Sequence, residues 1–97
     1  MKKIENILHY LGAPYSIATM DGEEVIYRSF TNFDFEVSGV NGHSNNFTLY
    51  VWDTTSAPTI IGIYSNIKGK EKLKDILGFY AVKYQNLISE IRVEREG

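Results

Sequence analysis

The order of apolar and polar positions predicts two neighbouring β-strands, at Phe47–Trp52 and Thr59–Tyr64. Side chains alternate between the two sides of a strand, so an antiparallel sheet with one face in water alternates apolar with polar residues. Neither segment alternates in this way. One side would carry Phe47, Leu49, Val51, Ile60 and Tyr64, and the other would carry Tyr50, Trp52, Ile61 and Ile63. The pattern therefore indicates that something covers the second face of this sheet.

Two helices are predicted, one at each end of the chain. An apolar stripe with helical spacing from Ile4 to Leu11 predicts a helix over about residues 2–11. Gly12 and Pro14 end it because glycine closes helices and proline cannot continue them. A longer stripe predicts a helix from about Lys70 to Arg92. Its members are Leu73, Ile76, Leu77, Tyr80, Tyr84, Leu87, Ile88 and Ile91. Phe79 and Val82 lie off this stripe, and of two options, packing against the first helix or forming a seam for a partner helix, we expect the first.

The segments between the first helix and Phe47 predict further strands. Tyr15–Met20 and Glu24–Phe30 are joined by Asp21-Gly22, a typical hairpin turn, and Phe33–Val40 alternates apolar with polar residues. A two-residue turn at Asn41-Gly42 would set Phe35 opposite Thr48 and mix polar with apolar partners. We therefore expect a longer loop or a glycine bulge within residues 39–46, which brings Phe35 across from Phe47 or Leu49.

These elements predict one α+β domain over residues 1–97. Four or five antiparallel strands form a meander, flanked by the short N-terminal helix and the long C-terminal helix. The second sheet face has three possible covers, namely one of the two helices, a second copy of the chain, or another partner or ligand. The length of 97 residues allows one core and is too short for two.

Composition and charge exclude several classes of function. The net charge of −2 argues against a general nucleic-acid binder, and the lack of cysteine removes thiol catalysis and thiolate metal sites. No stretch approaches the roughly 20 apolar residues of a membrane-spanning helix. We therefore expect a cytoplasmic protein without a membrane partner and without a cofactor.

No catalytic arrangement of residues can be identified in the sequence. The chain has two histidines, His9 and His43, and neither accompanies a nucleophile motif or a metal-binding motif. His9 is expected on the solvent side of the first helix, and His43 in a polar loop beside Ser44. We expect that the protein is not an enzyme.

Two functional hypotheses remain. The first is a small protein-interaction module, with a homodimer as one form, that binds through Tyr50, Trp52, Ile61 and Ile63. The second is binding of single-stranded nucleic acid or a nucleotide, in which Tyr50 and Trp52 stack on bases. Phosphate would then meet the basic segment at the start of the long helix, Lys68–Lys74, through Lys68, Lys70 and Lys72, because helix N-termini attract anions.

Overall fold

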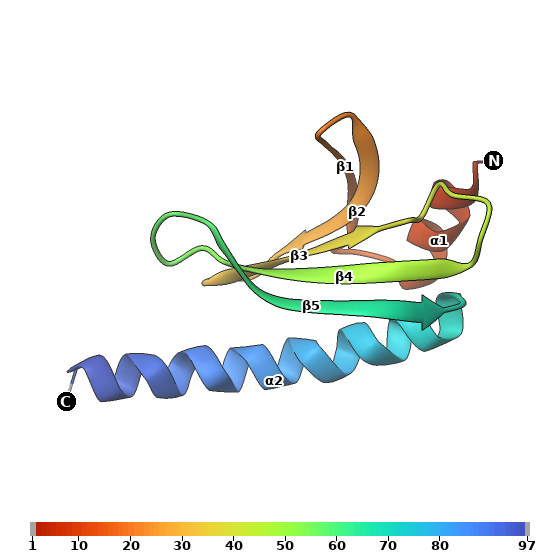
Figure 1. Ribbon diagram of the computed structural model, residues 1–97. Coiled ribbons are helices and arrows are strands. Elements are labelled where there is room, and N and C mark those ends of the chain that lie inside the picture. The colour runs from red at the N-terminus through yellow and green to blue at the C-terminus, as the bar shows by residue number, and fades with distance from the viewer. Residues whose placement is uncertain (1, 97) are drawn as a thin grey trace.

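The computed structural model describes residues 2–96, with side chains as far as Leu87 (Figure 1). Helix α1 (Lys3–Leu11) leads into five strands, and helix α2 (Lys70–Glu96) follows them. The strands are β1 (Ser16–Met20), β2 (Glu23–Ser29), β3 (Phe33–Ser38), β4 (Asn46–Asp53) and β5 (Thr59–Lys68). The predicted α+β fold with a meander between terminal helices is confirmed. Ile88 and Ile91 of the predicted stripe lie outside the described side chains.

The five strands form one antiparallel sheet in sequence order, β1-β2-β3-β4-β5. The connection between β3 and β4 covers residues 39–45 and begins with Gly39 at a φ of 81°, so the expected long loop is confirmed. The expected partner of Phe35 is wrong. Phe35 lies opposite Val51, because the loop over residues 39–45 is long enough to shift the pairing past Leu49. Both residues are fully buried, so the apolar pattern selects the face although it does not fix the register.

Strand β5 departs from the predicted strand in length and in sidedness. It continues four residues past Tyr64 to Lys68 and adds the buried Ile67 to the core. Between Val51 and Trp52 the partner on β5 changes from Gly62 to Ile60, which leaves Ile61 as the extra residue of a bulge. Ile60 therefore lies opposite Trp52. The prediction that Ile60 shares a face with Tyr64 is wrong, because the bulge interrupts the alternation.

Both helices pack on the same face of the sheet. A single apolar cluster joins Ile4 and Ile7 of α1 to Leu73, Leu77 and Tyr84 of α2. The sheet contributes alternate residues to this cluster, namely Ile26, Phe33, Phe35, Val37, Phe47, Leu49, Val51 and Ile67. The possibility that one helix covers each face is thus excluded, and in the described part of the chain no helix covers the second face.

The β1–β2 hairpin partly encloses this second face. It bends away from the side on which α2 lies, so the sheet is concave on its helix-free side (Figure 1). Val25 lies on the face opposite Ile26, and both side chains are fully buried. The curvature of the sheet therefore gives part of the cover that the sequence pattern demands.

Helix α2 runs along β5, and a close aromatic contact holds the two together. The rings of Tyr64 and Tyr80 are stacked with centroids 3.9 Å apart, and the hydroxyl groups of Tyr64 and Tyr84 are hydrogen-bonded. Gly62 permits this approach. A Cβ at residue 62 would overlap the Tyr84 hydroxyl and would lie 3.0 Å from the Tyr64 ring.

We predict that Gly62→Ala lowers the free energy of unfolding by about 1–3 kcal/mol through overpacking. In a Tyr84→Phe background the same substitution should cost less, because the overlapping oxygen is gone. Urea unfolding of the four proteins measures this coupling. Gly78→Ala is the matched control: residue 78 has open space around it within α2, so alanine there should stabilise the chain by up to about 1 kcal/mol. Equal costs of Gly62→Ala in both backgrounds would contradict the proposed contact.

Candidate interaction surface

Strand β5 is an edge of the sheet and its longest strand. Over the described residues it is hydrogen-bonded to β4 on one side and to no strand on the other. Edge strands of stable monomers are usually short, charged or interrupted by proline, because a bare edge pairs with other chains. β5 has ten residues, and its single charged residue is Lys68 at the end. The middle of this edge thus carries no charge and no proline, although its pairing with β4 is irregular at Ile61 and again opposite Phe47–Leu49.

Large apolar side chains are exposed along the same edge. Ile60, Ile61 and Ile63 keep 39%, 41% and 57% of their surface in solvent, and Phe79 on α2 keeps 63%. We call these four residues the β5 surface. The prediction that Phe79 and Val82 pack against the first helix is wrong, since Val82 is also 60% exposed. Exposed apolar groups that gather at an unpaired edge are typical of an interaction site.

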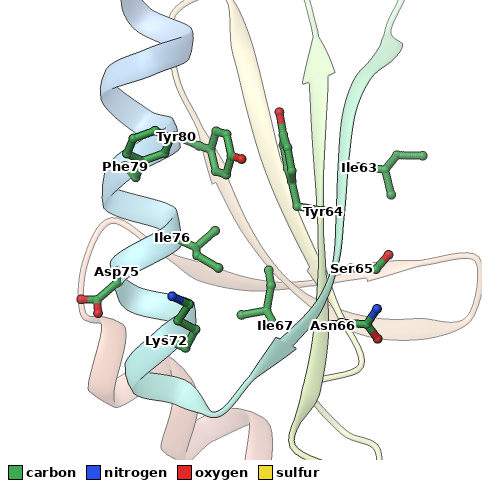
Figure 2. Close-up of a pocket in the computed structure, with 10 residues that line it drawn as sticks. All are labelled: Ile63, Tyr64, Ser65, Asn66, Ile67, Lys72, Asp75, Ile76, Phe79 and Tyr80. Atoms are coloured by element: carbon green, nitrogen blue, oxygen red, sulfur yellow. The ribbon is translucent and has the colours of Figure 1, made fainter.

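A groove of about 630 Å³ separates β5 from α2 on this side of the molecule (Figure 2). Tyr64 and Ile67 point from the strand toward the helix, whereas Ile63 points away from it. Charged side chains of both signs, Lys72 and Asp75, line the groove together with Phe79. The groove therefore combines an apolar floor with a rim of mixed charge.

The predicted site residues Tyr50 and Trp52 lie in a second hollow, on the concave face below the β1–β2 hairpin. This hollow measures about 360 Å³, and both aromatic side chains are half-buried in it. The Trp52 Nε1 donates a hydrogen bond of 3.0 Å to the Glu36 carboxylate. Ile60 lines the same hollow and also belongs to the β5 surface. The four predicted residues are thus divided, with Tyr50 and Trp52 in the hollow and Ile61 and Ile63 at the edge.

The concave face is acidic, and this changes the properties of a nearby tyrosine. The Tyr27 hydroxyl donates a 2.6 Å hydrogen bond to the Asp34 carboxylate. Burial of the phenol raises the pKa of Tyr27 strongly, and the hydrogen bond and negative charge of Asp34 raise it further. Tyr27 therefore stays neutral well into the alkaline range.

The lysines at the start of α2 do not gather near Tyr50 and Trp52. Lys70 and Lys74 place their ammonium groups 4.9 Å and 5.0 Å from the ring centre of Tyr10, on α1. Lys72 lines the groove beside Asp75, and Lys68 ends β5 opposite Asn46. Tyr50 and Trp52, which would stack on bases, lie on the sheet face opposite the one that the helices cover.

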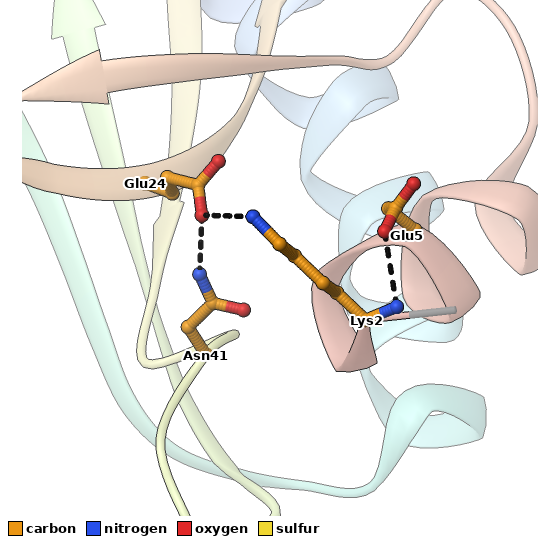
Figure 3. Close-up of polar contacts among 4 residues, drawn as sticks. All are labelled: Lys2, Glu5, Glu24 and Asn41. Carbon is orange, nitrogen blue, oxygen red and sulfur yellow. Dashed lines mark hydrogen bonds and ion pairs between the residues drawn. The ribbon is translucent and has the colours of Figure 1, made fainter.

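Polar contacts hold the start of α1 against the loop between β3 and β4 and against the β1–β2 hairpin. These contacts give several charged side chains a partner within the chain. Glu24 accepts from the Asn41 amide at 2.8 Å and pairs with Lys2 at 3.9 Å, while Glu5 accepts from the Lys2 backbone N–H (Figure 3). The Lys3 ammonium donates to the carbonyls of Gly42 and Ser44. These contacts position structural elements and hold no open site.

The histidines take no part in a shared site. His43 lies exposed in the loop after β3, and His9 lies exposed on α1. Among the residues that the structure describes, no group of three acidic or histidine side chains could hold a metal ion. No described helix has an apolar stretch long enough to cross a membrane.

Comparison with protein-family models, with curated proteins and with solved structures finds no match to this chain. Two members of the β5 surface were not predicted: Ile60, which was expected on the other face, and Phe79, which was expected against the first helix. The position of Phe79 off the main stripe of α2 was the available signal, but nothing in the sequence placed that side of the helix beside an open strand.

We predict that the chain loses stability as the pH rises above about 10, the ordinary pKa of tyrosine. Below that pH, Tyr27 is protonated in both the folded and the unfolded chain. Above it, the unfolded chain releases a proton that the folded chain retains, so unfolding becomes more favourable. Asp34→Asn should lower the pKa of Tyr27 in the folded protein, whereas Glu71→Gln on α2 should not.

The phenolate absorbance during an alkaline titration measures this difference, and Tyr27→Phe identifies the transition that belongs to Tyr27. An unchanged titration curve in Asp34→Asn would show that the carboxylate does not control the phenol.

Proposed function

We propose that this chain is a small, non-enzymatic protein-interaction module that binds a partner through the β5 surface. The proposal is carried by one observation: the longest strand of the sheet is an edge with three exposed isoleucines. A partner strand added there would pair with the unpaired backbone groups and bury the isoleucines. Affinity would come from the backbone and from apolar burial together.

The concave face would extend this contact. Ile60 belongs to both regions, so a partner on the edge can reach the hollow that holds Tyr50 and Trp52. Half-buried aromatic side chains are frequent anchors of protein interfaces. This retains the four predicted residues in one proposed site, with Ile60 and Phe79 added to them.

Nucleic-acid binding has weaker support than this proposal. The lysines that would contact phosphate are divided between Tyr10, the groove and the end of β5, as described above. The absence of catalytic activity and the cytoplasmic location remain predictions from the sequence.

We predict that Ile61→Lys/Ile63→Lys weakens partner binding at least tenfold and leaves the fold intact, because both side chains are exposed and the charges block edge pairing. Ser16→Lys/Thr19→Lys is the matched control, since it adds two lysines to exposed positions of the opposite edge strand, β1. Circular dichroism checks the fold. Binding is measured in two ways. Sedimentation velocity reports self-association, and the immobilised chain is tested for proteins that it retains from an extract of its native cells.

The proposal fails if the wild type neither self-associates nor retains any protein that the Ile61→Lys/Ile63→Lys variant loses. It also fails if the β1 control weakens binding as much as the β5 variant does.

A further inference from the structure

The pattern of charges beside β5 identifies a partner for the proposed interaction surface. We infer that this partner is a second copy of the chain, a conclusion that rests on the proposed function. The two β5 strands would pair antiparallel across a two-fold axis and join the two sheets. The two α2 helices would then lie antiparallel beside each other on the same face of the joined sheet.

The position of Phe79 sets the centre of this arrangement. Tyr80 stacks on Tyr64, and the middle of β5 falls between Ile63 and Tyr64. Phe79 is therefore level with the middle of the strand, and it lines the groove that opens at the edge (Figure 2). A two-fold axis through the middle of the paired strands brings the two Phe79 side chains together. Their rings, each 63% exposed in the single chain, would become the apolar centre of the helix contact.

The charges on α2 reverse sign about Phe79. Asp75 lies four residues before Phe79 and Lys83 four residues after it, a spacing that places all three on one side of the helix. In an antiparallel pair centred on Phe79, Asp75 of one copy lies opposite Lys83 of the partner subunit, and the contact occurs twice. In a parallel pair Asp75 would meet Asp75. Of these two arrangements, only the antiparallel one places opposite charges together.

Both charged groups are available for this contact. Asp75 and Lys83 are exposed, and within the described residues no ion pair involves Asp75. The Lys83 ammonium lies 5.6 Å from the centre of the ring of Tyr80, and Tyr80 lines the groove. Neither residue has a strong partner to give up when the second copy binds.

The dimer would use the ten residues of β5 and five groove-facing residues of α2, namely Lys72, Asp75, Ile76, Phe79 and Tyr80. These 15 residues form a contact smaller than the roughly 20–30 residues per partner of a standard interface. The exposed isoleucines and Phe79 supply the apolar centre, and the charged pairs form the rim, which is the usual anatomy of an interface.

A charge-swap experiment on the full chain tests this geometry. Asp75→Lys alone sets a lysine opposite a lysine at both copies of the contact, and Lys83→Asp alone sets an aspartate opposite an aspartate. Each single variant therefore creates two repulsive contacts. Each should weaken the dimer about tenfold in sedimentation equilibrium, since exposed pairs contribute up to about 1 kcal/mol each. The double variant Asp75→Lys/Lys83→Asp restores attraction and should dimerise like the wild type.

Mixing the two single variants gives the sharpest result. One variant then carries two lysines and the other two aspartates at these positions, so both contacts of a mixed dimer are attractive. Native mass spectrometry of an equimolar mixture should show the mixed dimer in excess of either homodimer. Raising the salt concentration should reduce this preference, because the pairs are exposed. Circular dichroism confirms that each variant is folded.

The possible failures are distinguishable. A wild type that is monomeric at every concentration, but retains another protein that Ile61→Lys/Ile63→Lys loses, overturns the dimer and leaves the proposed function standing. A monomer that retains no such protein overturns both. A dimer that is weakened by Ile63→Lys, yet unaffected by either single charge change, overturns the antiparallel arrangement of α2.

Discussion

The structure depends on one apolar cluster between the sheet and both helices. Alternate residues of β3 and β4 supply the sheet side of this cluster, and Ile4, Ile7, Leu73 and Leu77 supply the helix side. Since both helices are used on one face, none remains for the other face or for the edge. The concave face is partly enclosed by the hairpin of β1 and β2, which bends away from α2 (Figure 1). The edge of β5 stays open because α2 packs on the face of the sheet, through Tyr64, Tyr80 and Tyr84. The helix does not occupy the position of a neighbouring strand.

The sequence predicted the class and order of the elements because these follow from local periodicity. Strands such as Phe33–Ser38 alternate clearly, and the stripe of α2 faces the core from Leu73 to Tyr84, although Leu87 is 40% exposed. It failed where the chain departs from regular alternation. The bulge at Ile61 shifts Ile60 to the other face, and the length of the loop after Ser38 sets the partner of Phe35. Neither feature has a local signature strong enough to specify it.

The candidate site was predicted in part for a related reason. Apolar side chains on both faces of β4 and β5 indicated that the second face needs a cover. This pattern selected Tyr50, Trp52, Ile61 and Ile63 as candidate site residues. Which of these would lie in a hollow and which at an edge depends on the strand order and the curvature of the sheet. Phe79 joins the surface only through the position of α2 on β5. The packing of two distant elements is a tertiary property, and the local order of apolar and polar residues does not specify it.

The two edges of this sheet are unequal, and the inequality limits how far chains could assemble. β5 has ten residues, whereas β1 has five and belongs to the hairpin that bends out of the sheet. If β5 paired with β1 of the next copy, each addition would expose a fresh β5, and the chains would grow into a fibre. Pairing of β5 with β5 uses up both long edges at once and leaves short, curved ones outside. In the proposed dimer, assembly through β5 would therefore end at two subunits.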